Sequence, residues 1–192
     1  KLPLIERFLK NGSSVLVAGK LANTILIAKG LKMSKSCADL ESFEYIKDLD
    51  LNSSGLHWPV DGVVAKDLNS KEHWTSLEDI SPLNTLTADE CVLDMGPATV
   101  GGFTAILRSA KTIFWNGPVG VCEDERFAKG TMELARSISR ISAFKVLGGG
   151  DTIAALNKFG LLDQFNHVST GGGSMLEFLS GKKLPGLEAL KK

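Results

Sequence analysis

Clusters of glycine and a few polar residues directly follow short apolar segments, and these are the residues of this chain best placed to do chemistry. The apolar run ending at Leu147 leads into Gly148-Gly149-Gly150-Asp151, and a second run leads into Thr170-Gly171-Gly172-Gly173. Glycine lets a backbone approach a ligand closely, and free N–H groups at the start of a helix bind anions. Two such turns favour a phosphate-binding site, with plain strand-to-helix turns as the alternative.

Asp151 has two interpretations of equal weight. It opens a predicted helix together with Thr152, so its carboxylate can act as the N-cap of that helix. Alternatively, it can hold the Mg²⁺ of a nucleotide phosphate, because hard cations prefer oxygen ligands. In the second turn, Ser174 and Glu177 have the spacing of a capping box, which predicts a helix that starts directly after Gly173.

The elements that would position these residues alternate between strand and helix. The predicted strands are Ser14–Ala18, Val60–Ala65, Cys91–Met95, Thr112–Trp115, Phe144–Leu147 and His167–Ser169. This alternation predicts an α/β fold, a Rossmann-like three-layer αβα sandwich with a mostly parallel six-stranded sheet. We expect one domain, with long loops and one antiparallel excursion between Leu49 and Leu86.

Charge and cysteine content exclude several classes of protein. The 192 residues carry 22 basic and 22 acidic side chains, which argues against a broad surface for nucleic acid or for an anionic membrane. The three cysteines form no CxxC pair and have no ligand spacing with the three histidines, so a structural zinc site is not expected. Unpaired thiols, and no apolar run long enough to span a bilayer, suit a cytoplasmic protein.

Known nucleotide motifs are missing from the sequence. It has no GxxxxGK[ST] P-loop, no GxGxxG and no protein-kinase signature. A nucleotide would therefore have to be bound by a different arrangement of loops.

Taken together, the loops resemble the C-terminal, nucleotide-binding domain of phosphoglycerate kinase, in a form that looks bacterial. The segments that carry the resemblance are Trp115–Val121 (WNGPVGV), Gly148–Thr152 (GGGDT), Ser169–Gly173 (STGGG), Leu21–Thr24 (LANT), Pro59–Asp61 (PVD), Leu93–Pro97 (LDMGP) and Gly181–Pro185 (GKKLP). Their order and spacing hold along essentially the whole chain. Residues 1–192 are therefore expected to form this domain, and the phosphoglycerate-binding N-terminal domain is expected to lie outside this chain.

The resemblance implies glycolytic phosphoryl transfer between 1,3-bisphosphoglycerate with ADP and 3-phosphoglycerate with ATP, assisted by Mg²⁺. The residues that it places in the adenine slot are Gly19, Gly96, Pro118 and Val121. It implies that Glu123 accepts hydrogen bonds from the ribose hydroxyls and that Asn116 lies close to the phosphates. It also implies that Asp151 holds Mg²⁺ and that Thr152 lies at the phosphates.

The same resemblance implies which groups act on the transferring phosphoryl. Its expected donors are the backbone N–H groups of Gly149, Gly150, Gly172 and Gly173. Lys1 matches the second lysine of the family's G-G-[AS]-K-V-x-x-K motif and would neutralise phosphate charge, so Lys1, Gly150 and Gly173 are the expected catalytic residues. Phosphoryl transfer depends mainly on positioning and on such donors, so no nucleophilic side chain is needed. We expect a monomer that binds ATP or ADP but meets the phosphoglycerates only through the missing domain.

Two positions depart from the family pattern. Ala18-Gly19-Lys20 stands where the family commonly has three glycines, so Lys20 either points to solvent or crowds the adenine slot. Cys122 replaces an aromatic residue next to Glu123, which is expected to loosen packing there. The alternative function is a stand-alone, non-catalytic nucleotide-binding module that keeps the fold but has lost the substrate half. A third possibility is a folded domain in which Lys20 and the missing upstream strand have abolished nucleotide binding.

Overall fold

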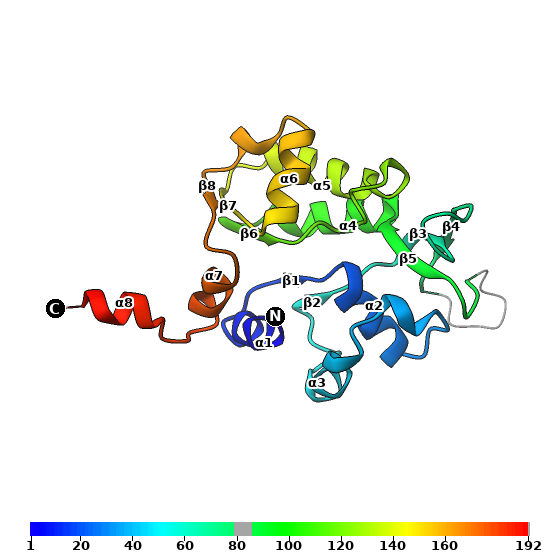
Figure 1. Ribbon diagram of the computed structural model, residues 1–192, viewed down its shortest axis with the longest axis horizontal. Helices are drawn as coiled ribbons and strands as arrows, with labels where there is room; N and C mark the ends of the chain where they lie inside the picture. Colours follow the sequence, from blue (N-terminus) through cyan, green and yellow to red (C-terminus); the bar gives the residue numbers. More distant parts are fainter. Residues whose placement is uncertain (79–85, 192) are drawn as a thin grey trace.

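The computed structural model describes residues 1–78 and 86–191, in which helices and strands alternate along the chain (Figure 1). The α-helices are α1 (Leu2–Lys10), α2 (Gly19–Ala28), α3 (Phe43–Asp48), α4 (Pro97–Leu107), α5 (Lys129–Ser139), α6 (Gly150–Lys158), α7 (Gly172–Leu179) and α8 (Pro185–Leu190). The strands are β1 (Val15–Leu16), β2 (Leu56–His57), β3 (Asp61–Ala65), β4 (His73–Ser76), β5 (Cys91–Met95), β6 (Thr112–Asn116), β7 (Phe144–Gly148) and β8 (His167–Ser169). No helix within the described ranges is long and apolar enough to cross a membrane.

The strands form three sheets rather than one. Strands β6, β7 and β8 are parallel neighbours in that order, and β1 pairs in parallel with β2. The third sheet has the order β4-β3-β5 and is antiparallel throughout. The prediction of a single six-stranded sheet is therefore wrong: in the described part of the chain the sheets have two, three and three strands.

The reasons for that difference are local. All six predicted segments do contain strands, but β3 and β5 pair antiparallel with each other instead of joining the parallel strands. Strand β2 is only two residues long, too short for a periodic signal. The predicted antiparallel excursion is confirmed by β4, and the part of that stretch at 79–85 lies outside the described residues.

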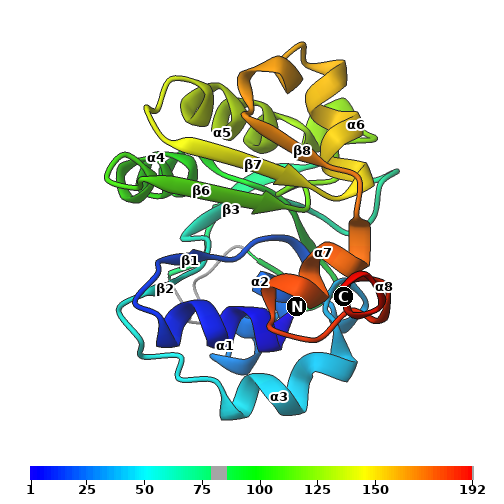
Figure 2. The same ribbon diagram turned by 90° about the vertical axis from the view of Figure 1, so that its left-hand side faces the viewer.

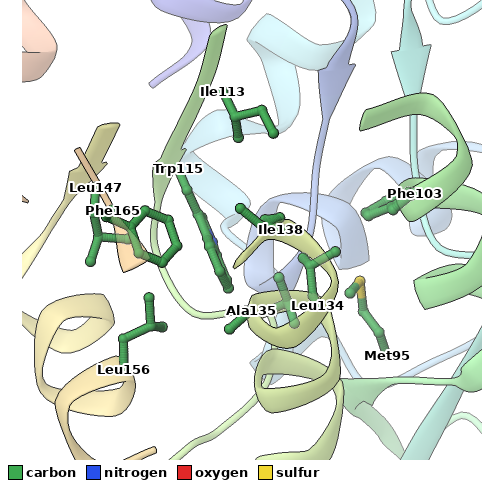
Figure 3. Close-up of a cluster of buried hydrophobic side chains, with 11 residues drawn as sticks. Met95, Phe103, Ile113, Trp115, Leu134, Ala135, Ile138, Leu147, Leu156 and Phe165 are labelled. Carbon is green, nitrogen blue, oxygen red and sulfur yellow. The ribbon is translucent and has the colours of Figure 1, made fainter. Parts of the chain in front are cut away.

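Helices lie on both sides of the β6-β7-β8 sheet, as expected for an α/β fold. Figures 1 and 2 show α5 and α6 on one side of this sheet and α1 and α7 on the other. The largest core cluster lies between the sheet and α4, α5 and α6, and Figure 3 shows its side chains. Trp115 and Leu147 point from the strands toward Leu134, Ile138 and Leu156 of the helices, and all five are buried.

A buried carboxylate ties α4 to the antiparallel sheet. Asp61, only 2% exposed, accepts hydrogen bonds from the Thr99 N–H at 2.7 Å, the Ala98 N–H at 3.0 Å and the Trp74 indole N–H at 2.9 Å. Burial alone would raise the pKa of Asp61, but the hydrogen bonds from Thr99, Trp74 and Ala98 outweigh it and hold the pKa below its usual value. The carboxylate thus satisfies the first turn of α4, whose N-cap Gly96 has no side chain to do so.

The carboxylate of Asp94 in β5 likewise accepts a hydrogen bond from the first turn of α5. Its side chain, 1% exposed, accepts hydrogen bonds from the Gly130 N–H at 2.7 Å and from the Met95 N–H at 2.9 Å. Burial raises the pKa of Asp94 to about 7, because these two bonds only partly compensate for the lost hydration of the charge.

Replacing Asp94 by Asn should therefore flatten the pH dependence of stability. The pKa of Asp94 is about 7 in the folded state and near its ordinary 3.8 when unfolded, so the folded state binds the proton more tightly. The Asp94 contribution to the free energy of unfolding should then fall by up to about 1.4 kcal/mol per unit as the pH rises from about 4 to about 7. Urea unfolding across this range should show that slope in the wild-type protein but not in Asp94→Asn.

Asp163 provides the matched control, because its carboxylate is exposed. Asp163→Asn should keep the wild-type slope. Identical slopes in the wild type and in Asp94→Asn would contradict the assignment.

Candidate nucleotide site

Parallel pairing brings the carboxyl ends of three strands to one edge of the sheet. In the register of the ladder, Asn116 at the end of β6 lies beside Gly148 of β7, which lies beside Ser169 of β8. The polar and glycine-rich turns that follow these strands therefore meet at the same edge. In parallel α/β sheets this edge is where ligands bind.

A buried hydroxyl connects the first two turns. The Gly117 N–H donates a 2.8 Å hydrogen bond to Oγ1 of Thr152, which is fully buried near the start of α6. Gly149, the N-cap of α6, has a φ of +91°, a conformation that favours glycine. A Cβ on Gly149 would lie 3.0 Å from Nδ2 of Asn116, so the backbone at Gly149 passes close to that amide. Thr152, predicted to lie at the phosphates, thus holds the Gly117 turn.

Asp151 is not the N-cap of α6. The helix has Gly149 as its N-cap and no side-chain capping hydrogen bond, and Asp151 is an exposed residue of the first turn. The N-cap interpretation is therefore wrong, and the carboxylate is left available to a ligand. Its position near the N-terminus of α6 favours a negative charge.

A cavity of about 1180 Å³ brings five of the predicted site residues together, namely Lys1, Gly19, Asn116, Pro118 and Asp151. Nζ of Lys1 lies 3.3 Å from the position that a Cβ on Gly117 would occupy, so this ammonium group reaches the turn after β6. Lys20 and Lys35 also line the cavity. Three carboxylates, those of Asp39, Glu41 and Asp151, line it as well, and this mixture of charges suits a ligand that carries both phosphate and a divalent cation.

The other predicted residues do not line this cavity. Gly96 is the buried N-cap of α4, packed against Asp61, and Val121 donates its N–H to the Leu93 carbonyl at 3.0 Å. Glu123 is exposed to solvent. Gly149, Gly150 and Thr152 lie at the turn from β7 into α6 that is described above. The structure therefore places part of the expected adenine slot, Gly19 and Pro118, on the cavity and the rest outside its lining.

Gly172 and Gly173 open α7 beside the end of β7. The N-cap is Gly171 and no side-chain capping bond forms, so the predicted capping box of Ser174 and Glu177 is wrong. The helix starts at Gly172, two residues earlier than expected. Met175 of α7 reaches Gly148, where a Cβ would collide with its methyl carbon. This contact holds the start of α7 next to the turn after β7.

The two departures from the family pattern have clear positions. Lys20 is exposed at the start of α2 and lines the cavity, so its side chain is both in contact with solvent and next to the site. Cys122 is buried, with Sγ 3.1 Å from Oγ1 of Thr131, and it packs in a small cluster with Ala128 and Ala155. The cysteine therefore fills its position in the core.

Sequence reasoning missed the role of Thr131. Its buried Oγ1 accepts hydrogen bonds from the N–H groups of Val119 at 3.1 Å and Gly120 at 3.3 Å, which fixes the turn that follows Pro118. No sequence motif signals this role, because a threonine inside a helix is usually read as a solvent-facing or core residue.

The described residues offer one part of a metal site rather than a complete one. No group of three or more His, Cys, Asp or Glu side chains among them could hold a metal ion. Asp151 supplies one exposed carboxylate on the cavity, and Glu41 supplies another. That donor set fits Mg²⁺ that arrives with phosphate oxygens and water, the arrangement in which Mg²⁺ is usually bound by one or two protein carboxylates.

Adding a methyl group at Gly149 should destabilise the turn, whereas adding one at Gly150 should not. Gly149→Ala forces a positive φ on alanine and brings Cβ within 3.0 Å of the Asn116 amide, so we expect a loss of about 1–3 kcal/mol in the free energy of unfolding. Gly150→Ala meets no atom within 4 Å and lies in α6, so stability should stay the same or rise by up to about 1 kcal/mol. Urea unfolding of both variants measures the difference, and equal stabilities would contradict this view of the turn.

Comparison with known proteins agrees with this arrangement. The family model described as "Phosphoglycerate kinase" matches residues 1–182. The chain is 38% identical over 195 residues to a phosphoglycerate kinase of Bdellovibrio bacteriovorus, with 100% of this chain and 48% of that protein covered. It is 40% identical over 196 residues to a phosphoglycerate kinase of Francisella tularensis subsp. novicida, with 100% and 49% covered.

Solved structures show the same relationship. The phosphoglycerate kinase of Coxiella burnetii matches with a TM-score of 0.88 and 37% identity over 99% of this chain and 49% of its own. That of Pyrococcus horikoshii matches with a TM-score of 0.85 and 34% identity over 99% and 48%. The chain thus spans about half the length of the relatives that it matches. From the family model and these relatives together, the chain belongs to the phosphoglycerate kinase family.

Proposed function

We propose that residues 1–192 form the nucleotide-binding, C-terminal domain of a phosphoglycerate kinase, which binds ATP or ADP with Mg²⁺. In this role the chain takes part in phosphoryl transfer between 1,3-bisphosphoglycerate with ADP and 3-phosphoglycerate with ATP. A second domain, absent from this chain, holds the phosphoglycerate. The observation that carries the proposal is the cavity on which Lys1, Gly19, Asn116, Pro118 and Asp151 meet.

Each group on the cavity has a chemical role in this proposal. The carboxylate of Asp151 contributes an oxygen ligand to Mg²⁺, which when bound offsets the charge of the phosphate oxygens. Lys1 and Asn116 lie at the turn after β6 and donate hydrogen bonds to the phosphates. Gly19 and Pro118 present little side-chain volume toward the cavity, which suits a flat base.

The N–H groups at the starts of α6 and α7 complete the proposed phosphate site. Gly149, Gly150, Gly172 and Gly173 supply them, next to the β6-β7-β8 edge. A phosphoryl group in transfer carries charge on its equatorial oxygens, and fixed N–H donors stabilise that charge without reorganising. We assign Gly96, Val121 and Glu123 to the adenosine end of the same site, with Glu123 at the ribose. The proposal also includes a monomeric, cytoplasmic protein, supported by three buried free cysteines that suit a reducing compartment.

Nucleotide binding can be tested by thermal unfolding with and without MgADP. At 100 times the dissociation constant, a ligand adds about 2.7 kcal/mol to stability, which for a domain of this size raises the midpoint by roughly 5–11 °C. Asp151→Ala should remove the magnesium-dependent part of this rise. Because Asp151 makes no capping hydrogen bond, the midpoint without ligand should fall by no more than about 4 °C.

The matched control is Asp163→Ala, which removes another exposed carboxylate that does not line the cavity. It should keep the full rise with MgADP. If Asp151→Ala keeps it too, Asp151 does not hold the metal. If the wild-type chain shows no rise at all, the chain has lost the nucleotide site and the proposal is wrong.

Catalysis by this chain on its own should be absent. The phosphoglycerate substrate has to be held in line with the nucleotide, and positioning supplies most of the rate in phosphoryl transfer. A coupled assay with the 192-residue chain, 3-phosphoglycerate and MgATP should give no turnover above background. Normal turnover would show that the substrate site lies within these residues and would contradict the proposed division of roles.

A further inference from the structure

Two of the three cysteines meet where the segment after α2 packs against the start of β5. Cys37 is the last residue of the short 3₁₀ helix η1 (Lys35–Cys37), and Cys91 is the first residue of β5. Both thiols are free and buried, with 8% and 6% of each residue exposed. Both belong to the apolar cluster that also contains Leu26 and Val64. The two sulfurs therefore share one apolar environment although they are far apart in the sequence.

Backbone hydrogen bonds hold the two segments side by side. The N–H of Ser34 donates to the carbonyl of Glu90 at 2.8 Å. The amide nitrogen of the buried Asn23 donates to the carbonyls of Cys37 at 3.2 Å and of Val92 at 3.1 Å. These bonds involve one cysteine itself and both chain neighbours of the other, so the positions of the two cysteines are fixed relative to each other.

The side chains of the two cysteines are also in contact. The thiol of Cys91 is a hydrogen-bonding neighbour of the thiol of Cys37. Sγ of Cys91 lies 4.0 Å from Oγ of Ser36, and the S–H of Cys37 donates to the carbonyl of Ser34 at 2.8 Å. Burial, together with the adjoining Cys91 thiol, raises the pKa of Cys37 to about 12. Cys37 is therefore a protonated thiol at neutral pH, which is the unreactive form of cysteine.

A single residue separates this pair from the cavity of the candidate site. Ser36 is exposed and lines the cavity, and its hydroxyl contacts Sγ of Cys91. The helix η1 that carries Ser36 is only three residues long, and 3₁₀ turns have poorer hydrogen-bond geometry than α-helices. Short elements of this kind open locally at a lower free-energy cost than the core does. A brief opening of η1 therefore exposes both sulfurs to a small solute.

We propose that Cys37 and Cys91 form a dithiol site that a hydroperoxide oxidises to a disulfide within the chain. The bond would join two segments that hydrogen bonds already hold together, so no strand or helix has to move to another place. Cys122 lies in a different cluster, with Sγ 3.1 Å from Oγ1 of Thr131, and takes no part. The site is separate from the proposed nucleotide chemistry and requires no nucleotide.

The reaction balances with hydrogen peroxide as the oxidant. The sulfur of one thiol attacks a peroxide oxygen, the O–O bond breaks, and the products are a sulfenic acid and one water. The sulfur of the second thiol then displaces the hydroxyl of the sulfenic acid, and its proton leaves with that hydroxyl as a second water. The two sulfurs together lose two electrons, and the peroxide is reduced to two waters. A dithiol reductant reverses the change by thiol–disulfide exchange.

The disulfide would fasten η1 to β5 and so hold one wall of the cavity. Lys35 and Ser36 line the cavity directly before Cys37, and Ala38 and Asp39 line it directly after. A cross-link that closes a long loop also restricts the unfolded chain. We therefore expect oxidation to raise the thermal midpoint by about 4–16 °C. An unchanged or lower midpoint of the oxidised chain would show that the bond distorts the fold, and would contradict a site that the fold has already prepared.

Peptide mapping without reduction tests which thiols are joined. The folded chain is treated with hydrogen peroxide, the remaining thiols are blocked with N-ethylmaleimide, and the product is digested with trypsin. The three cysteines then fall in three different peptides, which are residues 36–47, 72–108 and 112–126. The first two should appear joined, with a mass about 2 Da below their sum, because two hydrogens are lost. This pair should exceed any pair that includes Cys122 by at least about 10-fold, because a disulfide needs closely spaced thiols.

Cys122→Ser is the matched control, because Cys122 is also buried, with 8% exposed. It should keep the cross-link. Cys37→Ser and Cys91→Ser should each abolish it and leave the remaining thiol of the pair to gain oxygen, in steps of about 16 Da. The map of the wild-type chain needs no substitution, so the test holds even if one of these variants fails to fold.

Three results would overturn the proposal. The first is oxygen added to Cys37 or Cys91 with no bond between them. The second is a disulfide between two copies of the chain, seen as a dimer on a gel without reductant. The third is a cross-link that includes Cys122 as often as Cys91, as expected of thiols that react only after global unfolding. None of these measurements uses nucleotide, so a missing MgADP effect and a missing disulfide are separate outcomes.

Discussion

Parallel pairing of β6, β7 and β8 is the constraint on which the rest of the structure depends. It aligns Asn116, Gly148 and Ser169 in one row, so that the turns after three strands open on the same edge. The predicted phosphate-binding glycines, Asp151 and Thr152 all lie within a few residues of that row. The Gly117–Thr152 hydrogen bond and the contact of Met175 with Gly148 then fix the turns relative to one another.

Buried side chains, rather than local capping residues, hold the helices that surround this edge. The N-caps of α4 and α5 are Gly96 and Ala128, neither of which makes a side-chain capping bond. Asp61 and Asp94 supply the missing acceptors from neighbouring strands. This keeps the helix starts free of bulky polar side chains, and it explains why Gly96, Gly120 and Gly130 pack so closely against the two carboxylates.

The sequence predicted the strands and the turns after them well because both depend on local signals. Apolar runs followed by glycine identify buried strands and the turns after them, and the strands at 112–116 and 144–148 appear as expected. Pairing between distant strands leaves no such signal, so the antiparallel partnership of β3 with β5 was missed. The capping box at Ser174 is wrong although its local spacing is correct. The helix α7 starts at Gly172, so Ser174 lies inside the helix and cannot cap it. Thr131 is a third case, because its role depends on a turn eleven or twelve residues away.

The two parallel sheets are separated in space, which the alternation of strands and helices did not predict. A sequence that alternates strand and helix predicts one continuous sheet, yet β1-β2 and β6-β7-β8 lie on opposite sides of a cavity that residues of β1 and β6 line. Stable α/β domains bury the edges of their sheets, because unpaired N–H and C=O groups within an apolar space are costly. Lys1, Gly19 and Asn116 all line that cavity. The residues predicted for the phosphate end therefore line the same cavity as the backbone edges at Leu16 and Phe114.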